Sequence, residues 1–308
     1  MGIFITLFRI ALSRFLTVLG SERGEVDVAF VQQYTDALRI LVQQKKTKLR
    51  DTVLVDTNFN GEYKFYDQLG ADDMTEKVSR HQDTPTDATD HKRRRLSKRD
   101  FIHNKLLDTE DQLNMLIDPK STYMQSAAMS AGRKIDDVII EAFDAVSYSG
   151  KTGGDPESFT PGNIIAVGAA GMSKAKLITA REKLDDNDVE EEDRYLAMRP
   201  AQLSDLLNTT EVASSDYNTV KALVQGELDT WLGFSIRKTT RLGNNATGNR
   251  KCFAWHKAAI QLGIQKEPSG KIDQRPDKNY AWQCFFSMSI GATRLEEKRI
   301  IEIVCSEA

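Results

Sequence analysis

Residues that form covalent cross-links or hold metals are scarce in this chain of 308 residues. It has three cysteines, and no two of them stand in a C-x-x-C spacing. An odd number of cysteines without that spacing argues against a disulfide framework and against a zinc site. We therefore expect no metal and no other cofactor, and a reducing cytoplasm as the compartment in which the chain is made.

Residues suited to acid–base or nucleotide chemistry are also few. The four histidines lie outside any H-E-x-x-H or G-x-S-x-G pattern: His81, His91, His103 and His256. Gly150-Lys151-Thr152 resembles the end of a phosphate-binding loop, but Ala145 replaces the first glycine, and a helix C-cap fits the segment better. The acidic stretch 185–193 lacks the spacing of a calcium loop. We expect no catalytic site and no enzymatic activity.

Long uncharged apolar runs are missing as well. Arg9 and Arg14 interrupt the apolar start of residues 1–29, whereas a membrane span needs about 20 nearly uncharged residues. We expect no membrane partner and leave residues 1–29 as an N-terminal extension of unassigned role. With 42 Lys and Arg against 45 Asp and Glu, the formal net charge of −3 argues against a surface dedicated to nucleic acid.

What the chain does contain is one predicted helix of about thirty residues, from Asp118 to Gly150, where the usual globular helix has about 11 to 12. Asp118 suits the N-cap, Pro119 suits the first turn, and Ser149-Gly150 suits the C-terminal end. Apolar side chains recur at helical spacing along its whole length: Met124, Ala127, Ala128, Ala131, Ile135, Val138, Ile139, Ala142, Phe143 and Val146.

This helix is not stable alone. Burying its stripe yields about 10 to 20 kcal/mol, whereas ordering about thirty backbones costs about 30 kcal/mol or more. The helix therefore needs a long apolar surface, which we expect from a hairpin-like pair of strands, Ala281–Ile290 and Ile300–Val304. This predicts an α+β fold with the helix as its structural spine. The residues expected to form the spine are Asp118, Pro119, Ala131, Ile135, Val138, Ile139, Ala142 and Phe143.

A strongly charged segment precedes the spine. Strand-like residues 52–69, with a turn at Asn60-Gly61, lead into an acidic arm from Asp67 to Asp90 and then into six positive charges between Lys92 and Arg99. An isolated polar hairpin is marginally stable, so we expect a second copy of the chain to contact it head to tail. The residues expected at this contact are Arg50, Asp72, Asp73, Glu76, Arg93, Arg94, Arg95, Lys98 and Arg99. The alternative is that the basic run 92–99 binds nucleic acid, although interleaved aromatics are missing.

Elsewhere the patterns predict shorter elements. Helices are expected over 30–49, 173–184, 200–207 and 216–225, and extended segments over 194–198 and 234–242, while 252–262 fits either state.

Several short sequence motifs follow one another in a definite order along the chain. They are Phe30–Tyr34, Arg93–Arg95, Asp118-Pro119 leading to Ala131-Gly132-Arg133 and Asp136, Leu184-Asp185 with Val189 and Arg194-Tyr195, Asp216-Tyr217, Leu232-Gly233-Phe234, and Gly291 with Arg294-Leu295-Glu296. Together, from about Phe30 to Cys305, they resemble the major capsid proteins of tailed bacteriophages, with the Hong Kong 97-type fold in its compact form without a large N-terminal scaffolding domain.

The resemblance implies a division of the chain and a function. After the extension 1–29 it implies an N-arm at 30–50, an E-loop hairpin at 51–100, a peripheral domain from 101–150 plus 275–308, and an axial domain at 151–274. Pentamers and hexamers of such a chain form an icosahedral head shell around packaged double-stranded DNA, with a separate scaffolding protein and a portal as partners. The resemblance thus implies a structural protein of the virion capsid, assembled in the host cytoplasm.

Overall fold

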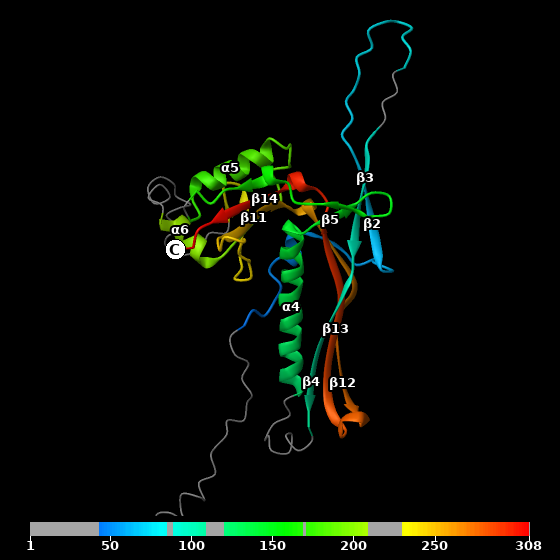
Figure 1. Ribbon diagram of the computed structural model, residues 1–308, viewed down its shortest axis with the longest axis vertical. Coiled ribbons are helices and arrows are strands. Elements are labelled where there is room, and N and C mark those ends of the chain that lie inside the picture. The colour runs from blue at the N-terminus through cyan, green and yellow to red at the C-terminus, as the bar shows by residue number, and fades with distance from the viewer. Residues whose placement is uncertain (1–42, 85–88, 109–119, 169–170, 209–229, 308) are drawn as a thin grey trace, which may run out of the picture.

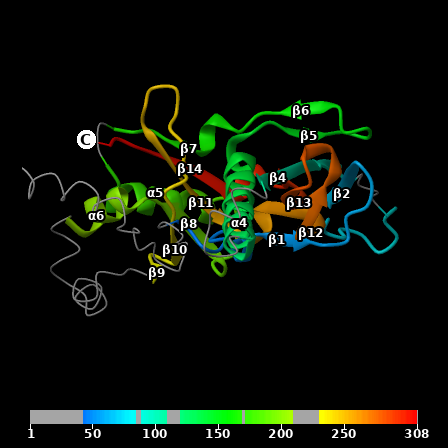
Figure 2. The same cartoon turned by 90° about the horizontal axis from the view of Figure 1, so that it is seen from below.

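The computed structural model describes residues 43–84, 89–108, 120–168, 171–208 and 230–307. Within these residues a long helix stands between a four-stranded and a six-stranded sheet, and a third sheet carries a projecting hairpin (Figure 1). Seen along the helix, the two larger sheets lie on opposite sides of it (Figure 2). None of the described helices is long and apolar enough to cross a membrane.

The four-stranded sheet has the order β1 (Leu54–Asp56), β12 (Ile260–Arg275), β13 (Ala281–Arg294) and β4 (Arg99–Leu107). All neighbours are antiparallel except β1 and β12, which are parallel. Alternate side chains of β13 are buried beneath the helix, as the two-residue period of a strand requires: Cys284, Phe286, Met288 and Ile290.

The spine helix, α4, runs from Lys120 to Asp144. Its buried side chains recur every three or four residues and include six of the predicted spine residues: Ala131, Ile135, Val138, Ile139, Ala142 and Phe143. Asp118 and Pro119 lie outside the described residues. The predicted end at Gly150 is wrong, because Ser147–Ser149 form a short strand, β5. The carbonyls of Phe143 and Ala145 accept hydrogen bonds from the Arg294 guanidinium at 2.9 and 3.0 Å, which satisfies the helix end.

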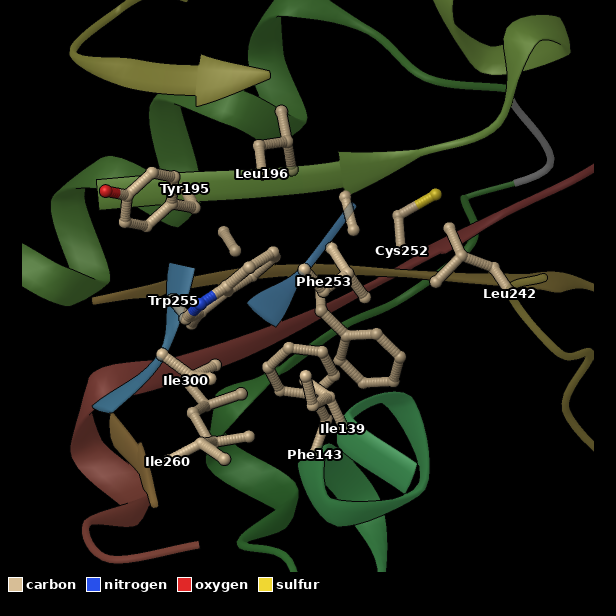
Figure 3. Close-up of a cluster of buried hydrophobic side chains, with 14 of the residues drawn as sticks. Ile139, Phe143, Tyr195, Leu196, Leu242, Cys252, Phe253, Trp255, Ile260 and Ile300 are labelled. Atoms are coloured by element: carbon tan, nitrogen blue, oxygen red, sulfur yellow. The ribbon is translucent and has the colours of Figure 1, made fainter. Parts of the chain in front are cut away.

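The six-stranded sheet has the order β7 (Ile164–Ile165), β14 (Ile300–Cys305), β11 (Arg250–His256), β8 (Arg194–Met198), β10 (Phe234–Lys238) and β9 (Thr230–Trp231). Phe143, near the end of α4, joins this sheet to the spine (Figure 3). Its ring centroid lies 4.8 Å from that of Phe253 and 4.7 Å from that of Trp255. One core therefore links the helix to both large sheets.

The predicted pairing of Ala281–Ile290 with Ile300–Val304 is wrong. A 3₁₀ turn at Glu297–Arg299 separates β13 from β14, which pairs with β11 in the other sheet. The partner of β13 is β12, and a 3₁₀ turn at Pro276–Lys278 followed by left-handed Asn279 and Tyr280 closes that hairpin. The ambiguous segment 252–262 contains the end of β11, the 3₁₀ turn Lys257–Ala259 and the start of β12.

Several local predictions are confirmed. The predicted helices 173–184 and 200–207 correspond to α5 (Lys174–Asp185) and α6 (Pro200–Asn208), and Ser173 caps α5 by accepting the Lys176 N–H. The predicted strand 194–198 is β8. Of the extended segment 234–242, only the part in β10 is a strand. The predicted helix 216–225 lies outside the described residues.

The third sheet has the order β2 (Tyr63–Leu69), β3 (His91–Ser97), β5 and β6 (Asp155–Glu157). Short 3₁₀ turns at Arg50–Thr52 and Pro161–Asn163 precede β1 and β7. Gly61 has a φ of +90° in the bend before β2, where the sequence predicts a turn.

The packing of α4 predicts that an Ile139→Asp variant fails to fold. Ile139 is fully buried, so an unpaired carboxylate there lowers the free energy of unfolding by more than about 4 kcal/mol. Ala128→Asp on the exposed side of the same helix is the matched control and leaves a soluble, folded subunit. Circular dichroism and urea denaturation measure both, and equal stability of the two variants would contradict the assignment of the buried face.

Candidate functional site

The most prominent surface feature is the hairpin of β2 and β3, which projects beyond the C-terminal end of α4 (Figure 1). Its antiparallel register runs from Tyr63 opposite Ser97 to Leu69 opposite His91. Past these strands, the described residues between 70 and 90 have no regular secondary structure and are almost all exposed. The hairpin contacts the rest of the described chain only at its base.

Two buried guanidinium groups hold the base of the hairpin. Arg94 of β3 is 6% exposed, donates from Nε to the Leu295 carbonyl at 3.1 Å and from Nη1 to Ser147 Oγ at 3.2 Å, and forms an ion pair with Glu157. Arg294 donates from Nη2 to the Glu157 carbonyl at 3.2 Å and to Glu297 Oε1 at 3.0 Å. We call these five residues the arginine hub: Arg94, Ser147, Glu157, Arg294 and Glu297.

The hub joins elements that are distant in sequence. Arg94 comes from the hairpin and Glu157 from β6, while Arg294 ends β13 and also satisfies the carboxyl end of α4. Burial lowers the pKa of Arg294, and Glu297 acts in the opposite direction. For Glu157, burial raises the pKa, but Ser149 and Arg94 outweigh it, so the net shift is downward. The arrangement pairs two buried guanidinium groups with partly exposed glutamates and fixes the hairpin to the spine.

A second contact stacks the hairpin on the β5–β6 turn. The Arg95 guanidinium lies 4.8 Å from the Tyr63 ring centroid and 4.5 Å from that of Tyr148, between the two aromatic faces. Gly153, at a φ of +67°, sits so close to Arg95 that a Cβ atom would lie 2.7 Å from its side chain. The segment 150–154 is therefore a β-hairpin turn, and the predicted helix C-cap at Gly150 is wrong.

The remaining cations of the basic run also have partners within the chain. Arg93 binds Asp67 on the neighbouring strand, with Nη2 3.1 Å from Oδ2, and this hydrogen bond lowers the pKa of Asp67. Arg99 grips Glu141 of α4 with two hydrogen bonds of 3.0 and 2.8 Å, which lower the pKa of Glu141. Exposed pairs complete the set: Lys92 with Asp90 at 3.7 Å and Lys98 with Asp100 at 3.8 Å.

Most of the cations predicted for the intersubunit surface have partners within the subunit. Arg93, Arg94, Arg95, Lys98 and Arg99 are engaged inside the subunit, and Arg50 binds Glu267 at 2.6 Å. Strand register accounts for one of these pairs, because it sets Asp67 opposite Arg93. A run of cations so neutralised also disfavours the nucleic-acid alternative.

The acidic residues predicted for the contact behave differently. Asp72, Asp73 and Glu76 are all exposed, and Asp72 accepts a hydrogen bond from Thr89 Oγ1 at 2.7 Å. Met74 and Val78 beside them are 101% and 84% exposed. We call residues 71–84 the acidic tip. It presents negative charge and apolar side chains that the described part of the chain leaves uncovered.

A buried carboxylate anchors the arm that enters the structure at residue 43. Asp136 of α4 accepts hydrogen bonds from Gln44 Nε2 at 2.5 Å, the Lys48 N–H at 3.1 Å and the Leu49 N–H at 3.2 Å. Burial raises the pKa of Asp136, against the effect of these donors. These contacts hold residues 43–49 without helical structure, so the predicted helix over 30–49 is wrong there, and residues 30–42 lie outside the described chain.

Sequence reasoning did not assign roles to Arg294, Glu157 or Asp136. Two features of the sequence could have indicated these roles: Arg294 ends an apolar strand, and Asp136 lies within the apolar stripe of a helix. A charge at such a position is buried and therefore needs a partner. Among the described residues, no three His, Cys, Asp or Glu side chains converge as metal ligands.

The hub predicts unequal effects for neighbouring arginines. Arg94→Met leaves the buried Ser147 hydroxyl and the Leu295 carbonyl without their guanidinium donor and removes the ion pair with Glu157, so it lowers the free energy of unfolding by about 2 kcal/mol. Arg93→Met breaks an exposed pair and costs less than about 1 kcal/mol. Urea denaturation of both variants at neutral pH is the measurement. Comparable losses would show that Arg94 is not a structural centre.

Comparisons with known proteins agree with this architecture. A model of the phage capsid protein family matches residues 26–307. Similar solved structures include the capsid of Cyanophage P-SCSP1u, at 19% identity and a TM-score of 0.74, covering 92% of this chain and 95% of that one. A Mycobacterium phage Che8 structure has 12% identity and a TM-score of 0.70, with 89% and 97% covered. The Cyanophage Pam1 capsid has 11% identity and a TM-score of 0.72, with 91% and 97% covered.

A search of curated protein sequences finds no significant match. The solved structures show that the α+β fold of this chain is the one expected from the resemblance, that of phage capsid proteins. The family match extends over both large sheets, the spine and the projecting hairpin. This chain therefore belongs to the phage capsid protein family.

Proposed function

We propose that this chain is the major capsid protein of a tailed bacteriophage and that it self-assembles into the icosahedral shell of the head. Family membership supports a structural role in the capsid. The observation that carries the proposal is the acidic tip, which is exposed and held out from the subunit by the arginine hub. A rigid body with an uncovered projection is suited to repeated contacts with copies of itself.

The geometry favours head-to-tail assembly. The acidic tip lies far from the subunit's own α4, so its partner surface belongs to a different copy (Figure 1). A contact between two different surfaces of one chain closes into rings when the rotation permits, and such rings are the pentamers and hexamers of a shell. Several modest contacts per subunit add up because each further contact is effectively intramolecular.

The three sheets suggest how the chain is divided into domains. In our proposal residues 30–50 are the N-arm, anchored at its end by Asp136, and 51–100 are the E-loop with the acidic tip. The peripheral domain contains α4, β4 and β13, and the axial domain contains most of the six-stranded sheet. Residues 260–274 of β12 lie in the sheet under α4, so by structure they belong with the peripheral domain. β14 lies in the six-stranded sheet, so by structure it belongs with the axial domain.

The proposal extends to partners and place. The shell would enclose double-stranded DNA as cargo, would need a scaffolding protein and a portal, and would assemble in the host cytoplasm before becoming part of the virion. A net charge of −3 suits a shell wall that does not adhere tightly to its cargo. Intramolecular pairing of the cations between Lys92 and Arg99 supports cargo enclosure over specific nucleic-acid binding.

The exposed tip generates a prediction about assembly. Replacing residues 72–83 by a shorter Gly-Ser link leaves folding intact, because these side chains are exposed, but abolishes shells and capsomers. A Gly-Ser replacement of the same length tests whether assembly needs the side chains of the tip or only its length. Electron microscopy and size-exclusion chromatography read out assembly, and circular dichroism reads out folding. Shells of normal size from the shortened chain would rule out this role for the tip.

A further inference from the structure

Two of the three cysteines lie side by side in the six-stranded sheet. Cys252 is on β11 (Figure 3), and Cys305 is the last residue of β14, its antiparallel neighbour. Arg250 is the residue opposite Cys305, and Cys252 follows Arg250 by two positions, so both cysteines stand diagonally on one face of the sheet. Both are fully buried, and their thiols hydrogen-bond to each other. The third cysteine, Cys284, lies on β13 in the other large sheet.

The two thiols differ in how readily they ionise. The hydrogen bond with Cys252 lowers the pKa of the Cys305 thiol, and the Lys176 ammonium adds to this effect, so that together they outweigh burial. The ammonium is held at this strand end because it donates to the carbonyls of Gly171 at 3.0 Å and Val304 at 2.9 Å. The same hydrogen bond and burial raise the pKa of Cys252. Because the thiolate is the nucleophile in disulfide exchange, Cys305 is the attacking sulfur.

Solvent reaches Cys305 through the end of β14. Arg250 and Cys305 form the last pair of the β11–β14 ladder, and the end of a ladder opens more readily than its middle. Glu307 fastens the chain just beyond, 2.7 Å from Arg250 Nη2 and 3.0 Å from Arg199 Nη1. These ion pairs are partly exposed and therefore individually weak. Brief release of residues 305–307 exposes the Cys305 thiol while the rest of β14 stays paired.

We propose that Cys252 and Cys305 form a disulfide that locks the end of β14 to β11 when the protein meets a medium rich in small-molecule disulfides. In a reducing compartment both thiols persist. Diagonal neighbours in a sheet usually lie about 7 to 8 Å apart, whereas the Cα atoms of a disulfide are about 4.4 to 6.8 Å apart. The strand end must therefore move toward β11, and the release that exposes Cys305 permits this movement.

The exchange proceeds in two steps. The Cys305 thiolate attacks one sulfur of the small disulfide, which forms a mixed disulfide on Cys305 and expels one thiolate. Cys252 then loses its proton to solvent and attacks the Cys305 sulfur, which forms the protein disulfide and expels the second thiolate. Two protein thiols are oxidised, and one small disulfide is reduced to two thiols. No step depends on assembly, because both cysteines belong to one subunit.

The disulfide braces the six-stranded sheet at a buried strand. β14 lies between β7 and β11, and all six of its residues are buried. The bond closes a loop of about 50 residues and so restricts the unfolded chain. We expect the oxidised chain to unfold at a temperature about 5 °C above the reduced chain. An unchanged unfolding temperature would contradict the bracing role.

Mass spectrometry with thiol counting tests the bond itself. The folded full-length chain is incubated with an excess of oxidised over reduced glutathione and then unfolded in a maleimide reagent. We expect one maleimide adduct in place of three, a linked peptide pair containing residues 252 and 305, and a monomer on a non-reducing gel. Three adducts, a chain that stops at the glutathione adduct, or a bond that includes Cys284 would overturn the proposal.

Serine variants separate the roles of the cysteines, with circular dichroism as the check on folding. Cys284→Ser is the matched control and should form the same disulfide. Cys252→Ser keeps a hydrogen-bond donor but no resolving thiol, so it should stop with glutathione on Cys305. Cys305→Ser should react with neither, because the attacking thiol is gone. Glutathione on Cys252 in the Cys305→Ser variant would contradict the assigned order.

Glu307→Gln tests the route of access. It should speed disulfide formation by about fivefold, because it loosens the strand end and removes a negative charge near the Cys305 thiol. Glu267→Gln breaks a similar ion pair, with Arg50, in the four-stranded sheet and should leave the rate unchanged. Equal rates for the two variants would overturn access through the end of β14.

Discussion

The pairing of two buried guanidinium groups with carboxylates and carbonyls is the interaction on which the rest of this structure depends. Arg94 and Arg294 bring together the projecting hairpin, the end of the spine helix, the β5–β6 turn and the connection between the two large sheets. Burying such charges is costly unless the geometry satisfies them, and here backbone carbonyls and two glutamates do so. The orientation of the hairpin is consequently a property of the folded subunit.

This internal pairing decides which charges remain for contacts between subunits. Cations of the basic run pair across strands and against α4, as Arg93 does with Asp67 and Arg99 with Glu141. The acidic tip keeps its carboxylates and its apolar side chains uncovered.

Much of the fold could be predicted from local patterns, because the apolar spacing from Ala127 to Phe143 specifies a buried helix face. The end of that helix could not be predicted, because it depends on hydrogen bonds from Arg294, which is about 150 residues away in sequence. The same limit explains the misassigned strand partner: Ile300–Cys305 has the composition of any buried strand, and nothing local says which sheet receives it. For the site, the sequence predicted a polar arm over residues 67–90, and the acids at its tip are exposed. It could not foresee the register that sets Asp67 opposite Arg93.

The central claim is that a hairpin fixed by the subunit's own core holds the acidic tip out for contact with another subunit. Electron cryo-microscopy of the assembled particle, at a resolution that traces side chains, tests it most directly. The account predicts that residues 72–83 of one subunit contact a neighbouring subunit, with the hairpin in the same orientation to α4 as in the isolated chain. A tip that contacts no other subunit, or a hairpin rotated about its base with the arginine hub broken, would contradict it.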